Sequence, residues 1–123
     1  LEGDKCLKTI ATIIVSSKRR ERDFAAGYGG KEFVLLLPFT DLKGAEQVAQ
    51  ELIQNVQDRN IQSAKKALYP VVTISVGISA FSPTHKKNAV VNPIGLIGKA
   101  DIHLFKAKQA GRNQYSADTK KST

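Results

Sequence analysis

The sequence predicts an α+β fold in which a central, mostly antiparallel sheet is flanked by helices. Three observations predict it: an amphipathic helical pattern near the N-terminus, two apolar strands around a pair of glycines, and two later helical patterns separated by a β-branched run. The predicted order is helix, strand, strand, helix, strand, helix and a short last strand. No internal repeat or low-complexity linker interrupts the 123 residues, so they most simply form one domain.

Hydrophobic spacing predicts the first helix and the hairpin that follows it. Apolar residues recur at i, i+3, i+4 and i+7, which predicts an amphipathic helix over residues 4–17 with Asp4 as its N-cap. These apolar residues are Leu7, Ile10, Ala11 and Ile14. Residues 23–28 and 32–37 have the pattern of two strands in a hairpin. The second strand is apolar throughout and ends at Pro38, so we expect it to be buried on both faces.

Capping residues delimit the elements of the second half. Asp41 is expected to cap one helix, and Asn92, followed by proline, a second helix that Gly111 stops. The inner face of the helix after Asp41 consists of Ala45, Val48, Ala49, Leu52, Ile53 and Val56. The other expected elements are a β-branched strand at 71–78, a polar loop at 82–92 and a short strand near 114–116.

Composition is that of an ordinary globular domain. Hydrophobic residues make up 41% and charged residues 24% of the chain, and no run of about 18 apolar residues predicts a membrane-spanning helix. The first residues do not form a signal peptide and methionine is absent, so we interpret the chain as a fragment of a longer protein, which we expect to be cytoplasmic. The single cysteine, Cys6, excludes an internal disulfide.

The net charge of +8 favours an anionic partner: a nucleotide, a nucleic acid or an acidic membrane surface. The alternative is that surface lysines only confer solubility. The densest cluster of cations comprises Lys18, Arg19, Arg20 and Arg22. A nucleic-acid partner is not expected, because the chain lacks the aromatic-rich basic strands that RNA-binding modules use.

The turn of the predicted hairpin, Tyr28-Gly29-Gly30-Lys31-Glu32-Phe33, has the residues of a ligand site. Two adjacent glycines let the backbone approach a bulky charged ligand, because no Cβ intervenes. Glu32 could hold a metal or act as a base. Lys31 is the anomaly, because it puts a positive charge where phosphate-transfer chemistry usually requires a carboxylate.

A second candidate site lies at the end of the last predicted helix. Lys108 and Arg112 are spaced i, i+4, which puts them on one face of a helix, where they could hold a triphosphate. The alternative is that these cations only complement the negative end of the helix dipole.

Four segments in order resemble one known family, the GGDEF domain of diguanylate cyclases, which condense two GTP into cyclic di-GMP. They are Gly3-Asp4-x-x-Leu7-x-x-Ile10-Ala11, the hairpin segment Tyr28–Phe33 followed by Leu36-Leu37-Pro38, Thr73–Ile78, and Lys99-Ala100-Asp101 through Asn113. The resemblance implies a fold like that of adenylyl cyclases and polymerase palms. It implies a GGDEF-like domain over residues 1–117, N-terminally incomplete, and a polar tail at 118–123.

The resemblance also implies roles for residues at matching positions. Asp4 is implied to hydrogen-bond guanine. Gly29 and Gly30 are implied to form the turn that lies against the nucleotide, and Lys108 and Arg112 are implied to contact the GTP phosphates. Glu32 matches the family's second acidic position, near the nucleotide and the metal. Arg20 and Asp23 match the RxxD motif of the inhibitory site, where cyclic di-GMP binds.

The chain departs from the family pattern at several positions. Lys31 stands where the family has an acidic metal ligand, and the strand that carries a further metal-binding Asp and a guanine-binding Asn would precede Gly3. Gly27 and Glu51 stand where arginines are usual. No metal site is therefore intact, and Mg²⁺ is implied only if cyclase activity remains.

These observations predict a degenerate GGDEF domain, a regulatory module that binds cyclic di-GMP or GTP without turnover. One alternative is an active diguanylate cyclase. Another is a ligand-free structural or dimerisation domain attached to a sensor or phosphodiesterase domain. The resemblance also implies a homodimer and further sensor or phosphodiesterase domains in the full-length protein, which would be cytoplasmic or would have this domain in the cytoplasmic part of a membrane-bound sensor.

Overall fold

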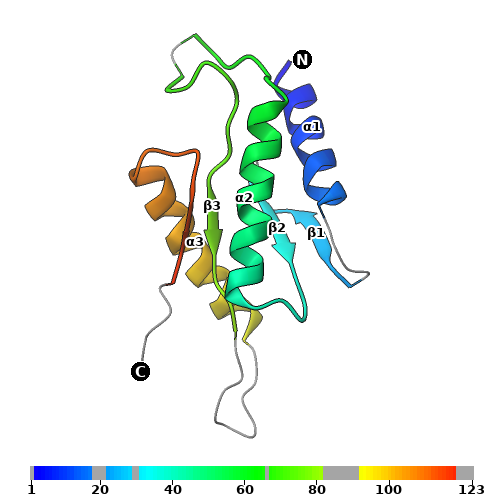
Figure 1. The fold of residues 1–123 in the computed structure, drawn as a ribbon, viewed down its shortest axis with the longest axis vertical. Helices are drawn as coiled ribbons and strands as arrows, with labels where there is room; N and C mark the ends of the chain where they lie inside the picture. Colours follow the sequence, from blue (N-terminus) through cyan, green and yellow to red (C-terminus); the bar gives the residue numbers. More distant parts are fainter. Residues whose placement is uncertain (1, 18–21, 29–30, 66, 82–91, 119–123) are drawn as a thin grey trace, which may run out of the picture.

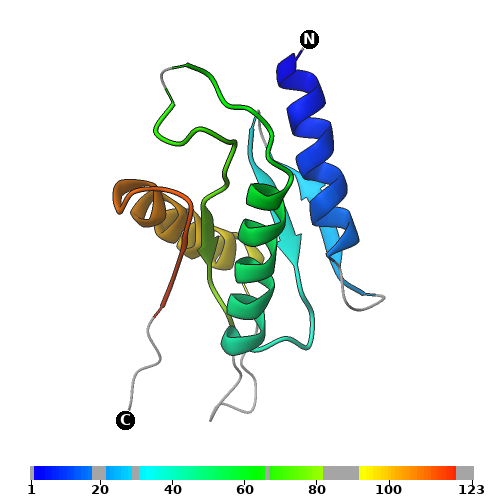
Figure 2. The ribbon, with the colours of Figure 1, turned by 45° about the horizontal axis from the view of Figure 1, so that its top comes forward.

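The computed structural model describes residues 2–17, 22–28, 31–65, 67–81 and 92–118. Seven elements follow one another in the predicted order. They are α1 (Glu2–Ser16), β1 (Phe24–Gly27), β2 (Phe33–Leu36), α2 (Leu42–Asp58), β3 (Val76–Ile78), α3 (Pro93–Gln109) and β4 (Tyr115–Ala117). Helices α1 and α2 lie side by side on one side of the strands, and α3 packs on the other side against β3 and β4 (Figures 1 and 2). This layered arrangement confirms the α+β fold class.

The described strands form two small sheets. In the first, β1 and β2 pair antiparallel, with Phe24 opposite Leu36. In the second, β3 and β4 pair in parallel, with Val76 opposite Tyr115. The parallel pairing follows from the chain's path, because a helix such as α3 can connect two parallel strands whereas a tight turn cannot.

The β-branched run at 71–78 forms a shorter strand than predicted. Only Val76–Ile78 belongs to a ladder, and Val71 makes an isolated antiparallel bridge with Gln62. β-Branched residues favour extended backbone, but a ladder also needs a neighbouring strand, and β4 pairs with only three residues of the run.

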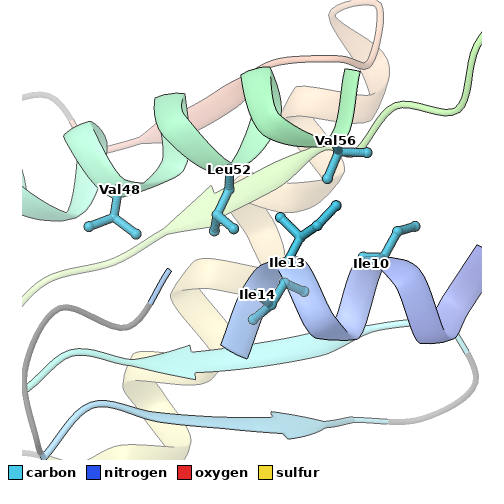
Figure 3. Close-up of a cluster of buried hydrophobic side chains, with 6 residues drawn as sticks. All are labelled: Ile10, Ile13, Ile14, Val48, Leu52 and Val56. Atoms are coloured by element: carbon cyan, nitrogen blue, oxygen red, sulfur yellow. The ribbon is translucent and has the colours of Figure 1, made fainter. Parts of the chain in front are cut away.

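The hydrophobic core lies between α1 and α2 (Figure 3). Its buried side chains are Ile10, Ile13 and Ile14 from α1 and Val48, Leu52 and Val56 from α2. Ile13 was not among the residues predicted for the apolar face of the first helix. Leu7 was predicted there but is only half-buried. The α2 residues repeat every four positions, as one buried helical face requires, so the predicted inner face of α2 is confirmed there.

Two predictions about the first half of the chain were wrong. Helix α1 begins at Glu2, so Asp4 lies within its first turn and is not the N-cap. Strand β2 is not buried on both faces: Leu36 is 43% exposed, and its cross-strand partner Phe24 is 57% exposed. The physical reason is that helices α1 and α2 cover one face of this hairpin, where Phe33 and Leu35 pack against the core.

The predicted helix boundaries in the second half are confirmed. The Asp41 carboxylate accepts from the backbone N–H of Gly44 at 2.8 Å, and the Asn92 side chain accepts from that of Gly95 at 3.3 Å. Gly111 has a φ of 125°, the left-handed conformation that ends many helices. The predicted loop at 82–92 falls almost wholly outside the described residues. None of the described helices is both long and apolar enough to cross a membrane.

Candidate nucleotide-binding site

The hairpin turn between β1 and β2 presents a cation. The backbone N–H of Tyr28 donates to the carbonyl of Glu32 at 2.8 Å and closes the turn. Lys31 is exposed and Glu32 is half-buried. Gly29 and Gly30, the predicted nucleotide-binding glycines, lie outside the described residues. An exposed ammonium group at this turn can pair with a phosphate but cannot coordinate a metal ion.

Lys108 and Arg112 do not share one helical face, contrary to the prediction. Helix α3 ends at Gln109, and Arg112 lies beyond it with a φ of 62°. The N–H of Arg112 donates to the carbonyl of Ala107 at 3.0 Å, and that of Gly111 to Lys108 at 3.4 Å. These two bonds are the Schellman motif, which ends the helix one residue after Lys108, so Arg112 does not lie one helical turn beyond it. Both cationic side chains are exposed at this end of α3.

The guanidinium-bearing residue Arg112 borders a cavity of about 190 Å³. The lining combines polar and apolar side chains: Ser63, Ala67, Leu68, Tyr69, Val71, Val72, Thr73 and Arg112. The Tyr69 hydroxyl donates to the carbonyl of Gly111 at 2.8 Å, which ties the loop before β3 to the turn after α3. The structure therefore holds the Arg112 turn between α3 and this loop.

Asn113, the residue after Arg112, also belongs to this turn, and no role was predicted for it. Its φ is 52°, and its side-chain N–H₂ donates to Gln57 of α2 at 3.3 Å. Its side-chain oxygen is buried and accepts no hydrogen bond from the described residues. Asparagine tolerates this left-handed conformation better than most residues, which is the only signal that the sequence carried.

The predicted inhibitory pair is described only in part. Arg20 lies outside the described residues. Asp23 is buried, with 6% of its surface exposed, directly before β1. The neighbouring Arg22 places its guanidinium carbon 5.7 Å from the centre of the Phe39 ring, a cation–π contact.

The remaining predicted position and departures are spread over the fold. Asp4 lies in the first turn of α1, Gly27 ends β1, and Glu51 is exposed on α2. Within the ranges that the structure describes, no three His, Cys, Asp or Glu side chains are grouped so as to hold a metal ion.

Buried polar contacts around β4 were not predicted. The Tyr115 hydroxyl donates to Glu46 of α2 at 2.9 Å, and this hydrogen bond is the main cause that raises the pKa of Tyr115 above its ordinary value. On the opposite face of β4, Ser116 contacts the buried His103 of α3. Helical periodicity places His103 on the same face as Ala107, but its partners depend on the path of β4, which periodicity does not reveal.

Helices on both sides of the strands make this an α+β fold, which is consistent with the nucleotide cyclase and polymerase palm fold that the sequence resemblance implied. The chain belongs to the GGDEF domain family: residues 1–114 match the family described as "Diguanylate cyclase, GGDEF domain". The family that the sequence motifs indicated is thereby confirmed.

Relatives agree in sequence and in structure. Diguanylate cyclase A of Treponema denticola is 34% identical over 112 residues, which are 91% of this chain and 28% of that protein. The coiled-coil and GGDEF domain of DgcB from Caulobacter crescentus, solved with c-di-GMP, is similar with a TM-score of 0.76 at 23% identity, over 94% of this chain and 58% of that one. The active GGEEF domain of a Vibrio cholerae diguanylate cyclase gives 0.77 at 22% identity, over 98% and 70%. The chain spans between 16% and 28% of the length of three curated diguanylate cyclase relatives that it matches.

Proposed function

We propose that this chain is a degenerate GGDEF domain, a regulatory module of a cyclic di-GMP signalling protein that binds GTP or cyclic di-GMP without turnover. One observation carries the proposal: the hairpin that gives the family its name has Lys31 in place of the acidic residue. The Vibrio cholerae domain, which is described as active, has the motif GGEEF and so keeps an acid there.

The residues present do not fit a Mg²⁺ site. Mg²⁺ prefers carboxylate and phosphate oxygens, and Lys31 offers an exposed ammonium group instead. At about 4 Å from a divalent ion, exchanging a carboxylate for an ammonium turns attraction into repulsion, a change of roughly 4 to 16 kcal/mol between the dielectric of water and an effective value of about 20. Glu32 alone supplies too few ligands for a metal site.

Exposed cations support the proposed binding of phosphate. Lys108 and Arg112 are exposed at one end of α3, and Arg112 borders the cavity of about 190 Å³. Lys31 adds a third exposed cation that can pair with a phosphate. These groups support binding of a nucleoside triphosphate without its conversion to cyclic di-GMP.

Cyclic di-GMP is the second candidate ligand, and DgcB with bound c-di-GMP is the observation that favours it. The position of Asp23 weighs against it, since a residue that is only 6% exposed offers little surface to a ligand. The described geometry therefore favours GTP as the first ligand to test.

The test combines turnover and binding. The chain is incubated with GTP and Mg²⁺ or Mn²⁺, and cyclic di-GMP is measured against a control without protein; we expect no product above the control. Calorimetry then measures binding of GTP and of cyclic di-GMP. Lys108→Ala and Arg112→Ala should each weaken GTP binding by roughly 10- to 150-fold, the range for one charge-assisted hydrogen bond. Robust product formation would establish the active-cyclase alternative, and no binding of either ligand would establish the ligand-free one.

A further inference from the structure

The structure contains a buried histidine that bridges α3 and the end of the chain. His103 is 7% exposed. Its Nδ1 lies 2.9 Å from the Ser116 hydroxyl of β4, and its Nε2 lies 2.7 Å from a carboxylate oxygen of Asp118. Both ring nitrogens thus contact the C-terminal strand or the residue that follows it. Asp118 lies in the segment that the sequence analysis assigned to the polar tail.

When the ring carries a single proton, hydrogen-bond chemistry assigns that proton to one nitrogen. A carboxylate can only accept, so Nε2 must donate to Asp118 and carry the hydrogen. Nδ1 is then the acceptor, and the Ser116 hydroxyl donates to it. Every polar group of the cluster is satisfied in this arrangement, which favours a single orientation of the ring.

The electrostatics of Asp118 agree with this contact. The hydrogen bond from His103 is the main cause that lowers the pKa of Asp118. The positive charges of protonated His103, Lys99 and Lys106 lower it further, while desolvation opposes them. Strand β3, the neighbour of β4, contributes only Val76, Gly77 and Ile78, none of which is charged. On the far face of β4, the charged and titratable groups are Glu46 and Tyr115.

We propose that His103 is a positioning residue that latches β4 onto α3 through Ser116 and Asp118, and thereby fixes the turn that carries Arg112. The second half of this statement rests on the proposed GTP site. The short segment between Ser116 and Arg112 supports this link. Only three residues separate them, and backbone hydrogen bonds hold both ends of the segment: the N–H of Val76 donates to the carbonyl of Gln114 at 3.0 Å, and the N–H of Arg112 donates to the carbonyl of Ala107 at 3.0 Å.

The two faces of β4 contact different helices through their side chains. Tyr115 points to α2, where Glu46 accepts its hydrogen bond, and Ser116 points to α3 and His103. Only three residues of β4 pair with β3. A strand so short depends on its side-chain contacts, so losing the latch should raise the opening rate of β4 more than that of the α1–α2 core.

Amide hydrogen exchange on the full chain tests the latch. Ser116→Ala and Asp118→Ala each remove one partner at a position that is not buried, so the chain should stay folded. We expect the protection of the β4 amides to fall about two- to fivefold in each variant, because solvent screens the largely exposed Asp118. Protection in α1 and α2 should not change. Equal β4 protection in both variants and the parent would overturn the proposal.

A titration separates the latch from simple packing. His103→Leu replaces the imidazole with an apolar side chain of similar size. In this variant the pKa of Asp118 should rise towards its ordinary value of about 3.9, which carboxyl ¹³C NMR can follow. In the parent, ¹⁵N shifts of the neutral imidazole should show the proton on Nε2. An Asp118 pKa that is the same in His103→Leu and the parent would refute the contact.

GTP calorimetry on Ser116→Ala and Asp118→Ala tests the link to Arg112. We expect GTP affinity to fall two- to fivefold, in parallel with the β4 protection. Lower protection with unchanged affinity would overturn the positioning of Arg112. If the parent binds no GTP at all, the proposed function fails instead, and the exchange and titration results decide the latch alone.

Discussion

At the scale of single residues, the proposed binding without turnover rests on Lys31. Its ammonium group is exposed at the hairpin turn, where a nucleotide's phosphates could reach it. A cation there favours an anionic ligand and disfavours a divalent ion, so the same residue has opposite effects on binding of phosphate and of metal. GTP binding by this chain should consequently need no metal.

Replacing Lys31 should make GTP binding depend on metal. In the parent, we expect calorimetry to give similar GTP affinities with Mg²⁺ and with EDTA. In Lys31→Asp the carboxylate can share a metal ion with the phosphates, so Mg²⁺ should strengthen binding about tenfold, the effect of roughly one charge-assisted contact. Lys31→Ala is the matched control, because it removes the cation without adding a ligand, and it should show no metal dependence. Strong Mg²⁺ dependence in the parent would contradict this interpretation of Lys31.

The Tyr115–Glu46 pair should limit stability in alkali. The hydrogen bond to Glu46 raises the pKa of Tyr115 in the folded chain above the ordinary value of 10.0. A group with a raised folded pKa stabilises the fold fully below its unfolded pKa and loses that contribution as the pH rises through its folded pKa. Thermal unfolding midpoints should therefore fall more steeply above pH 10 in the parent than in Tyr115→Phe, which has no ionisable group there. Parallel curves for the two proteins would show that the pair does not couple to folding.

At the scale of secondary-structure elements, the crossing of β3 and α3 leaves no room for a side chain. A Cβ placed on Gly77 would lie 2.0 Å from the carbonyl oxygen of Ala100 and 2.2 Å from the backbone nitrogen of Leu104. Both atoms belong to the backbone of α3 and cannot move without moving the helix. Glycine is thus required by packing, with no need for an unusual φ.

Gly77→Ala should destabilise the fold by about 1 to 3 kcal/mol, the usual range for overpacking, or by more if α3 separates from β3. Urea unfolding followed by circular dichroism measures the change. Gly98→Ala is the matched control on α3, because no atom lies within 4 Å of its Cβ position. There the substitution should stabilise the helix by up to about 1 kcal/mol. A tolerated Gly77→Ala would mean that the helix sits further from the strand than the structure shows.

The same elements show what could be predicted from the sequence. The caps at Asp41 and Asn92 and the stop at Gly111 were predicted correctly, because each depends on contacts within a few residues. The relation of Lys108 to Arg112 was not, because the glycine between them ends the helix before the i, i+4 spacing applies. The His103 cluster could not be predicted either, since it needs residues 13 and 15 positions away to return to α3.

At the scale of the whole molecule, apolar and basic surfaces coexist. Exposed large apolar residues occur on β1, β2 and the outer side of α3: Phe24, Leu36, Ile94, Ile102 and Phe105. The net charge is +8, with 19 Lys and Arg against 11 Asp and Glu. An excess of this size creates a long-range positive field that concentrates anions near the surface.

This field should make binding of the anionic nucleotide sensitive to salt. Raising the ionic strength from about 0.1 M to about 1 M shortens the Debye length from about 10 Å to about 3 Å, so the contribution of all but the nearest cations is screened. We expect GTP affinity, measured by calorimetry, to fall about tenfold or more over this range. Guanosine is the matched control ligand, because it has the same base without phosphates, and its weak binding should hardly change. If GTP affinity were equally insensitive to salt, recognition would rest on the base rather than on Lys31, Lys108 and Arg112, and the phosphate-binding role of these residues would have to be abandoned.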